Sequence, residues 1–244
     1  MENRLTRLQE FQKILANYQI SDESKQTLTR TKLALMVGPT SCGRNTIIRH
    51  LVQQGGYRFL VSDTTRAKRS NDGVMEQDGV EYWFRSEDDV LADLRAGKFL
   101  EAAIIHAQQV SGVSIRELEH TIAADAIGIT DIEIIGVDTV KEMHAGAHAF
   151  FVLPPSFTEW QRRLHHRGEM TPAEKRRRME SAVHEFSHAL EVGFYHFIVN
   201  DSIESAAAQV NKVTSGKSNT RAEKQARELA IELLTETQYW LAKH

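Results

Sequence analysis

The sequence predicts an α/β fold in which helices cover both faces of a parallel sheet. From residue 114 onward, short apolar segments alternate with segments of helical periodicity, and this alternation is typical of a parallel sheet with helical crossovers. Earlier in the chain, an apolar run at 33–38 is followed by a glycine-framed loop and a helical segment at 45–54. A chain of 244 residues, 41% of them hydrophobic, can bury one such core with additional segments.

Two regions have other patterns. Residues 3–18 carry apolar side chains at steps of three and four, so they predict an amphipathic helix within an N-terminal extension at 1–31. Short alternating segments between 57 and 113 surround a loop rich in Gly, Asp and Asn, and they predict a small insert built largely of strands. The core is then expected at 32–56 and 114–213.

The second part of the core is predicted to contain several further elements. The expected helices lie at 114–124, at 137–144 and from 156, and the expected strands lie at 127–134, 148–153 and 195–199.

A capping signal marks one more helix. Thr171 supplies an N-cap, Pro172 the first helical position and Glu174 the glutamate of a capping box. A helix should therefore begin there and run to about 192, with a helical lid at about 165–180. A final helix is expected within 214–244, after the polar stretch at 215–220.

Composition excludes some classes of protein. The net charge of -3 gives no global field to recruit nucleic acid or an anionic membrane, so any anion site must be local. The single cysteine, Cys42, cannot form an internal disulfide. No apolar run approaches the roughly 20 residues that span a bilayer. We expect a cytoplasmic protein that binds neither nucleic acid nor membrane.

The loop after the first strand has the G-x-x-x-x-G frame of a P-loop, in the required setting between a strand and a helix. Its glycines let backbone N–H groups converge on phosphate oxygens, and the following helix adds a partial positive charge. A simple glycine turn is the alternative. The residues expected to bind ATP here are Gly38, Pro39, Thr40, Ser41, Cys42, Gly43, Arg44, Asn45 and Thr46.

Two positions depart from the P-loop pattern. Arg44 stands where the motif has lysine, and Asn45 stands where it has the serine or threonine that binds Mg²⁺. Arg44 keeps the charge but presents a planar fork in place of a point charge. Asn45 offers an amide oxygen as a candidate Mg²⁺ ligand. Oxidation of Cys42 in this loop is expected to inhibit binding.

Further motifs follow the loop. They are SDTTRAKR at 62–69, EQDGVEY at 76–82, FLE at 99–101, TDIEIIG at 130–136, FVLPPSFTEWQRRLHHRG at 151–168 and FIVND at 197–201. Together with the P-loop they make the chain resemble the guanylate kinase family from about residue 32 to 213. The resemblance implies a P-loop NTPase-type fold, an acceptor-binding insert at 57–113 and transfer of a phosphoryl group from ATP, with Mg²⁺, to GMP.

The residues of the insert suggest how an acceptor would be held. Arg66 and Arg69 form a cationic cluster that can clamp a phosphate, with the hydroxyl of Tyr82 as a further donor. A solvated basic turn is the alternative. By the resemblance, Ser62 and Glu101 contact the guanine ring.

The resemblance implies further site residues. Glu133 assists with the base. The family has a tyrosine, a glycine and a threonine or serine where this chain has Ser111-Gly112-Val113, and Gly112 is the residue retained from that motif. Arg167 and Arg178 match the family's charge-stabilising lid arginines, beside Arg44 as a third catalytic arginine, and Asn200 matches a residue near the donor nucleotide. Solvated helix faces and an ordinary turn are the alternatives for the lid arginines and Asn200.

Three hypotheses stay open on the sequence. The leading one is an ATP- and Mg²⁺-dependent kinase for GMP or dGMP. The second is a binding module that kept the fold and lost turnover, to which Arg44, Asn45 and the missing tyrosine point. The third is a kinase for another phosphorylated small molecule. A protein partner could bind through the terminal helices.

Overall fold

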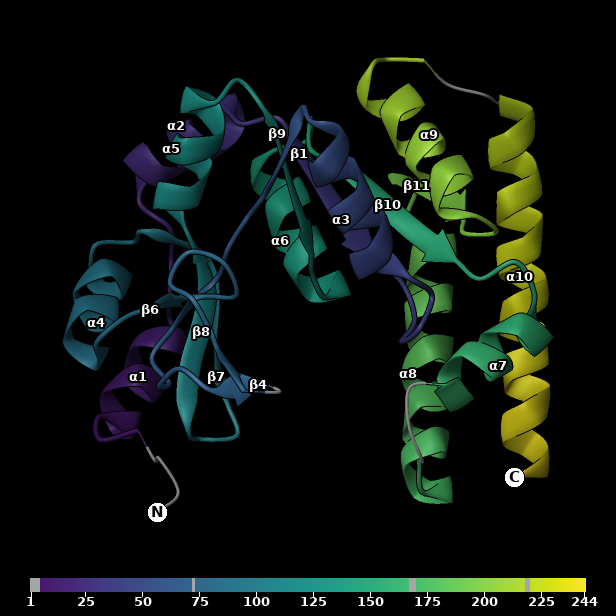
Figure 1. The fold of residues 1–244 in the computed structure, drawn as a ribbon, viewed down its shortest axis with the longest axis horizontal. Coiled ribbons are helices and arrows are strands. Elements are labelled where there is room, and N and C mark those ends of the chain that lie inside the picture. Colours follow the sequence, from purple (N-terminus) through teal and green to yellow (C-terminus); the bar gives the residue numbers. More distant parts are fainter. Residues whose placement is uncertain (1–4, 72, 167–169, 218–219) are drawn as a thin grey trace. The chain divides into compact units, whose positions relative to one another are not determined.

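A computed structural model gives the fold for residues 5–71, 73–166, 170–217 and 220–244. The chain forms two compact units, and Figure 1 labels most of their elements. The first, here the loop unit, consists of Leu33–Tyr57, Ile129–Thr139 and Ala147–His244. The second, here the insert unit, consists of Met1–Lys32, Arg58–Gly128 and Val140–Gly146. The sequence-based domain boundaries stay a prediction.

The loop unit is organised around parallel strands. β1 (Leu33–Val37) pairs in parallel with β10 (His148–Leu153), which pairs in parallel with β11 (Tyr195–Val199). All five residues of β1 are buried, as expected for a strand covered on both faces. The sheet has the order β11-β10-β1-β9-β2, and the chain passes between the units within β9 (Ile127–Asp131) and β2 (Tyr57–Phe59). The predicted α/β class with a parallel sheet is confirmed.

Helices flank these strands. They are α3 (Arg44–Gln54), α6 (Ile134–Met143), α7 (Phe157–His166), α8 (Pro172–Glu191), α9 (Ile203–Thr214) and α10 (Thr220–Lys243). The start of α8 is as predicted, because the Thr171 side chain accepts a hydrogen bond from the Glu174 backbone N–H at 3.2 Å.

The C-terminal helix α10 lies along α8 (Figure 1). The Nζ atom of Lys175 is 5.0 Å from the ring centre of Trp240, and a guanidinium nitrogen of Arg176 donates to the Leu241 carbonyl. At the other end of α8, Arg227 donates to the carbonyl oxygen of Leu190. The two helices therefore run antiparallel, and Leu233 of α10 is fully buried.

The insert unit has a sheet of its own. Its four strands have the order β6-β3-β8-β7. The strands of this unit are β3 (Asp63–Thr64), β6 (Trp83–Phe84), β7 (Phe99–Ile105), β8 (Gln109–Ser114) and the hairpin β4 (Ser70–Asn71) and β5 (Val74–Met75). Its helices are α1 (Leu8–Leu15), α2 (Asp22–Arg30), α4 (Glu87–Arg95) and α5 (Ile115–Ala123).

The N-terminal helix packs on this unit. Phe11 of α1 is fully buried in a cluster that includes Leu91 and Phe99. The Tyr18 hydroxyl donates to the Phe99 carbonyl at 2.7 Å. The predicted apolar face of this helix therefore has a partner within the chain, while binding of a protein partner stays a prediction.

Some elements differ from the sequence-based expectation. The first helix is shorter than predicted, and the strand expected to reach residue 134 ends at Asp131 because α6 begins at Ile134. Helices α2, α4 and α9 were not expected. Each begins at a serine N-cap, namely Ser21, Ser86 and Ser202, whose side chain accepts from the backbone three residues later. No helix within the described ranges is long and apolar enough to cross a membrane.

Candidate functional site

The glycine-framed loop connects β1 to α3 in a conformation that two glycines make possible. Gly38 has φ of 142°, and a Cβ there would lie 2.5 Å from the Val152 carbonyl oxygen. Gly43 has φ of 99° in the left-handed region, and a Cβ there would lie 2.1 Å from Nδ2 of Asn200. Both the backbone angle and the space therefore require glycine at these positions. The predicted frame has a physical reason in the fold.

Side chains from distant elements hold the carbonyl groups of the loop. Nδ2 of Asn200 donates to the Cys42 carbonyl at 2.8 Å, and a guanidinium nitrogen of Arg163 approaches the same oxygen at 3.4 Å. The indole N–H of Trp160 donates to the Thr40 carbonyl at 2.8 Å. Because these carbonyls have donors of their own, the loop is held in one shape without a ligand.

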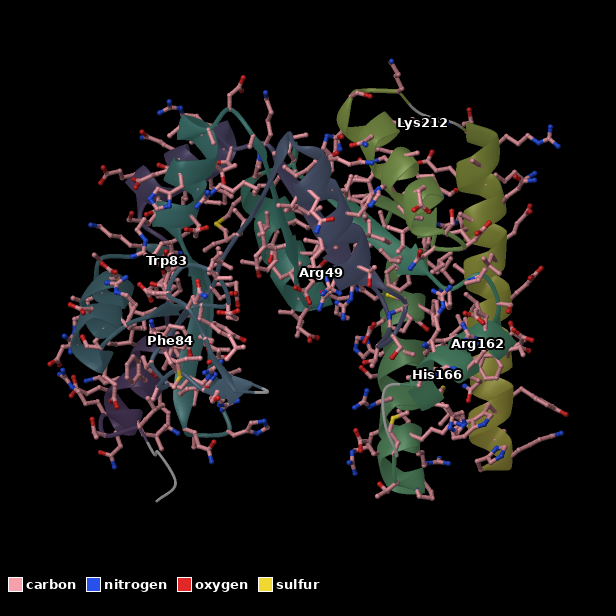
Figure 2. All side chains as sticks on the ribbon, in the orientation of Figure 1. Arg49, Trp83, Phe84, Arg162, His166 and Lys212 are labelled. Carbon is pink, nitrogen blue, oxygen red and sulfur yellow. The ribbon has the colours of Figure 1, made fainter. Side chains whose placement is uncertain are left out.

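A cleft of about 830 Å³ opens beside this loop in the loop unit. The first turn of α3 lines it, and backbone N–H groups at a helix start lack partners within the helix. Figure 2 labels two of the lining side chains, Arg49 on α3 and His166 at the end of α7. The complete lining is Ser41, Gly43, Arg44, Asn45, Thr46, Arg49, Asp131, Arg163, His166, Asn200, Asp201, Ser202, Ile203 and Glu204.

The loop residues divide into two groups. Ser41 and the residues from Gly43 to Thr46 line the cleft, as predicted for a binding loop. Oγ of Ser41 is buried and has no hydrogen-bond partner among the described residues. Gly38, Pro39 and Cys42 are buried, and Thr40 is half-buried. These four residues do not line the cleft and contribute to the shape of the loop.

Three arginines, Arg44, Arg49 and Arg163, line the cleft together with three carboxylates, those of Asp131, Asp201 and Glu204. Arg44 is the first residue of α3, where the helix dipole is positive. Arg163 is oriented by Glu159, with Nε 2.8 Å from Oε1, and a second nitrogen donates to the Asn200 carbonyl at 3.0 Å. Hydrogen bonds from Arg162 and Arg163 hold the pKa of Glu159 at about 2. The arrangement suits a polyanionic ligand.

A carboxylate on α8 lies within electrostatic range of Arg44. Burial raises the pKa of Glu185, while a hydrogen bond from Ser181 and the charge of Arg44 lower it. Oε2 of Glu185 is buried and accepts no hydrogen bond from the described residues. Arg44 itself is half-buried, and Asn45 beside it is exposed.

Several residues that line the cleft were not predicted as site residues, and one predicted residue lies elsewhere. Arg163, Arg49 and Asp131 line the cleft but were not selected as site residues. Arg178 does not line it; its Nη2 donates to Oε1 of Glu174 one helical turn away, at 2.5 Å. Arg167 lies outside the described residues. The i,i+4 spacing of Glu159 and Arg163 was the available signal for Arg163.

The cationic cluster of the insert unit is partly committed to an acidic partner. Arg66 forms a bidentate ion pair with Glu76, at 2.5 and 2.7 Å, and both side chains are at most 8% exposed. Hydrogen bonds from Arg66 hold the pKa of Glu76 at about 2. The guanidinium carbon of Arg66 also lies 4.8 Å from the ring centre of Tyr82 and 5.4 Å from that of Phe84.

The predicted cluster is therefore present in an ordered form. Arg66 and Tyr82 are in contact as expected, but Arg66 is a buried, oriented residue and not a solvated turn residue. The backbone N–H of Arg69 donates to Oε2 of Glu76 at 2.8 Å, and its side chain is exposed. Glu76, which the sequence analysis did not assign a role, positions both arginines.

Glu101, predicted to contact the base, and Gly112 lie on neighbouring strands. Glu101 is on β7 opposite Val113 of β8. Burial raises the pKa of the Glu101 carboxyl group above its ordinary value of 4.5, and a backbone hydrogen bond at Val113 partly offsets this. A Cβ at Gly112 would lie 2.3 Å from the Glu101 carbonyl oxygen. Gly112 thus allows β8 to approach β7 where Glu101 sits.

Two other predicted positions can be located. Ser62 is half-buried, and its carbonyl accepts a hydrogen bond from the Trp83 backbone at 2.9 Å. Glu133 is exposed and precedes α6 in the loop unit, whereas Ser62, Arg66, Arg69, Tyr82, Glu101 and Gly112 belong to the insert unit. The roles of all these residues stay predictions.

Comparison with known proteins gives a consistent result. The family model described as guanylate kinase matches residues 30–216. A guanylate kinase of Bifidobacterium longum (strain NCC 2705) is 37% identical over 184 residues, covering 73% of this chain and 91% of the relative. One of Symbiobacterium thermophilum is 34% identical over 182 residues, covering 74% and 83%. The crystal structure of guanylate kinase from Anaplasma phagocytophilum aligns with a TM-score of 0.53 at 26% identity, covering 78% of this chain and 87% of that one.

The loop cysteine gives a first prediction. Cys42 is fully buried, and burial raises the pKa of its thiol to about 11. The thiolate is the reactive form, so burial slows the reaction of this thiol, while the effect of oxidation on binding stays a prediction. At pH 8 the native protein should react with a thiol reagent far more slowly than the unfolded chain. Equal rates of labelling in the two states would contradict this burial.

Proposed function

The chain belongs to the guanylate kinase family and is a phosphotransferase, and we propose that its own residues catalyse direct transfer of the γ-phosphoryl group of ATP to GMP or dGMP, giving ADP and GDP or dGDP. The observation that carries the proposal is the loop that Asn200, Arg163 and Trp160 hold open beside an arginine-lined cleft. Phosphoryl transfer needs little covalent participation by the protein. It needs alignment of the reactants and positive charge at the migrating group.

The cleft of the loop unit is the proposed ATP site. The first turn of α3 presents backbone N–H groups toward an anion, and the unpartnered hydroxyl of Ser41 adds a donor. Arg44 takes the place of the P-loop lysine and contributes a fork of N–H donors to phosphate oxygens. Asn200 acts mainly through the loop, because its amide is bonded to the Cys42 carbonyl.

The same cleft fits a Mg²⁺ ion that enters with the nucleotide. Oxygen-bearing side chains of Asn45, Thr46 and Asp131 line it, and these are ligand types that Mg²⁺ accepts. Among the described residues, no group of three or more His, Cys, Asp or Glu side chains could hold a metal ion on its own. We therefore assign most of the metal's ligands to phosphates and water. When bound, the ion would neutralise phosphate charge.

The insert unit is the proposed acceptor site. Arg66, oriented by Glu76, together with Arg69 and Tyr82 would hold the acceptor phosphate. The Glu101 carboxylate would accept hydrogen bonds from the ring N–H and exocyclic amine of guanine, a pattern that adenine lacks, with Ser62 as a further contact. Gly112 acts indirectly, since it sets the strand spacing at Glu101. Glu133 keeps its proposed role of assisting with the base from the family resemblance.

Arginines supply the proposed charge stabilisation. Arg44 and Arg163 already line the cleft and are candidates for contact with the transferred phosphoryl group. Arg178, now paired with Glu174, would have to leave this partner to take part. Arg167 keeps its proposed catalytic role from the family resemblance alone.

The direct test measures ADP release from ATP and Mg²⁺ with a panel of nucleoside monophosphates. We expect turnover with GMP and dGMP and at least a hundredfold lower kcat/KM with AMP, because adenine leaves the Glu101 carboxylate without its donors. Turnover with another phosphorylated acceptor and not with GMP would show that this other compound is the substrate. The absence of turnover with every acceptor, with ATP still bound, would favour the binding module.

A matched pair of variants tests the role of the loop arginine. Arg44→Ala removes the charge from the cleft and should lower kcat/KM by about a hundredfold. Lys212→Ala removes a cation on α9 that is not among the cleft-lining residues and should leave kcat/KM unchanged. Full activity in Arg44→Ala would remove this side chain from the mechanism.

The raised pKa of Glu101 gives a pH prediction. As pH falls, a carboxyl group with a raised pKa takes up its proton at a higher pH than an ordinary glutamate. The protonated form cannot accept both guanine donors, so kcat/KM for GMP should fall on the acid side, beginning above the usual range of glutamate. In Glu101→Gln this acid limb should disappear, at lower overall activity. An identical acid limb in the variant would assign it to another group.

A further inference from the structure

Two buried carboxylates of the insert unit have no part in the function proposed above. Glu117 on α5 is fully buried, and Asp63 on β3 is 1% exposed. Buried carboxylates are costly unless charges and hydrogen bonds satisfy them, so their partners indicate what they hold in place. Two partners of Glu117 lie directly beside Ser62 and Tyr82, and Asp63 itself directly follows Ser62.

Glu117 joins two separate segments of the insert unit. Its Oε2 accepts from the Val61 backbone N–H at 3.1 Å, and its Oε1 accepts from the indole N–H of Trp83 at 2.8 Å. His120 and Arg58 approach the same carboxylate at 3.2 and 3.7 Å. Val61 directly precedes Ser62, and Trp83 directly follows Tyr82.

Asp63 reinforces the same junction. Its Oδ1 and Oδ2 atoms pair with Arg116 at 2.7 Å and with Arg85 at 3.0 Å. The Arg116 guanidinium carbon in turn lies 5.1 Å from the Trp83 ring centre. Asp63 and Trp83 are register partners in the pairing of β3 with β6.

Trp83, labelled in Figure 2 beside Phe84, is the side chain on which these contacts converge. Its backbone N–H donates to the Ser62 carbonyl at 2.9 Å. Its ring leaves no room for a side chain at Gly79, where a Cβ would lie 2.6 Å from the indole. The indole is thus held by Glu117 on one side and by the turn before Tyr82 on the other.

We propose that Glu117, acting through Trp83 and the Val61 backbone, is a positioning residue that fixes the distance between Ser62 and Tyr82, and hence between the base and phosphate contacts of the acceptor. This inference rests on the proposed function. A carboxylate can accept from both donors at once, whereas a neutral amide in its place offers one oxygen and turns an NH₂ group toward the other donor. Loss of the charge should therefore loosen the acceptor site specifically.

The test compares Glu117→Gln with Glu119→Gln, an exposed position on the same helix. Steady-state constants are measured with ATP and GMP varied separately, and thermal unfolding of each variant is recorded. In Glu117→Gln, KM for GMP should rise about tenfold, while KM for ATP and kcat at saturating GMP stay within about twofold. Glu119→Gln should match wild type in all constants.

A merely structural role would produce another pattern. It would lower the active fraction, so that kcat falls while both KM values stay unchanged, and this result or three unchanged constants would overturn the proposal. If Glu117→Gln fails to fold, Trp83→Phe decides the question, because it removes the indole N–H and keeps an aromatic ring. An unchanged KM for GMP in Trp83→Phe would then reject the proposal.

Failure of the proposed function gives a separate signal. If the wild-type protein does not phosphorylate GMP, the function itself is wrong and the acceptor assignment falls with it. If the wild-type protein turns over GMP but Glu117→Gln leaves KM for GMP unchanged, only the role of Glu117 is wrong. The wild-type assay therefore separates the two outcomes before any variant is compared.

Discussion

The hydrogen bond from Asn200 to the Cys42 carbonyl is the contact on which the proposed ATP site depends. It forms because Gly43 has no side chain, which lets the Asn200 amide lie where a Cβ would otherwise be. Asn200 is itself placed by the sheet, since it follows β11 and its backbone N–H donates to the Leu153 carbonyl at the end of β10 at 2.8 Å. Strand pairing thus fixes a side chain, and the side chain fixes the loop.

The insert unit uses a different means to the same end. There Ser62 and Tyr82 directly precede the two-residue strands β3 and β6, which have few ladder hydrogen bonds to hold them. Glu101 and Gly112 lie on the longer strands β7 and β8. Buried carboxylates take over this task near β3 and β6. Glu76 pairs with Arg66, and Asp63 pairs with Arg85. Glu117 accepts a hydrogen bond from the indole N–H of Trp83. Such pairs contribute little net stability compared with apolar packing, but breaking one leaves an uncompensated charge. They are therefore better suited to fixing geometry than to stabilising the fold.

Much of the fold could be predicted from local patterns. The apolar run at 33–38, the glycine frame after it and the capping box at Thr171 each depend on residues close in sequence, and each has the expected structure. What could not be predicted depends on distant residues. These features are the partner of Arg66, the burial of Cys42 and the placement of Arg163 in the cleft. Arg66 and Glu76 are 10 positions apart in the sequence, and Arg163 and Cys42 are 121 positions apart. Helix α2 has few apolar residues, so its sequence carries little helical periodicity, and the Ser21 N-cap is the local signal of its start.

The central claim is that the loop is preformed and that Asn200 holds it. The most direct measurement is the calorimetric affinity of ATP for the wild-type protein and for Asn200→Ala, with the fold of each checked by thermal unfolding. Without the amide, the Cys42 carbonyl loses its 2.8 Å donor, and we expect ATP to bind about tenfold more weakly or worse in a variant that remains folded. Equal affinity in a folded Asn200→Ala protein would contradict the account.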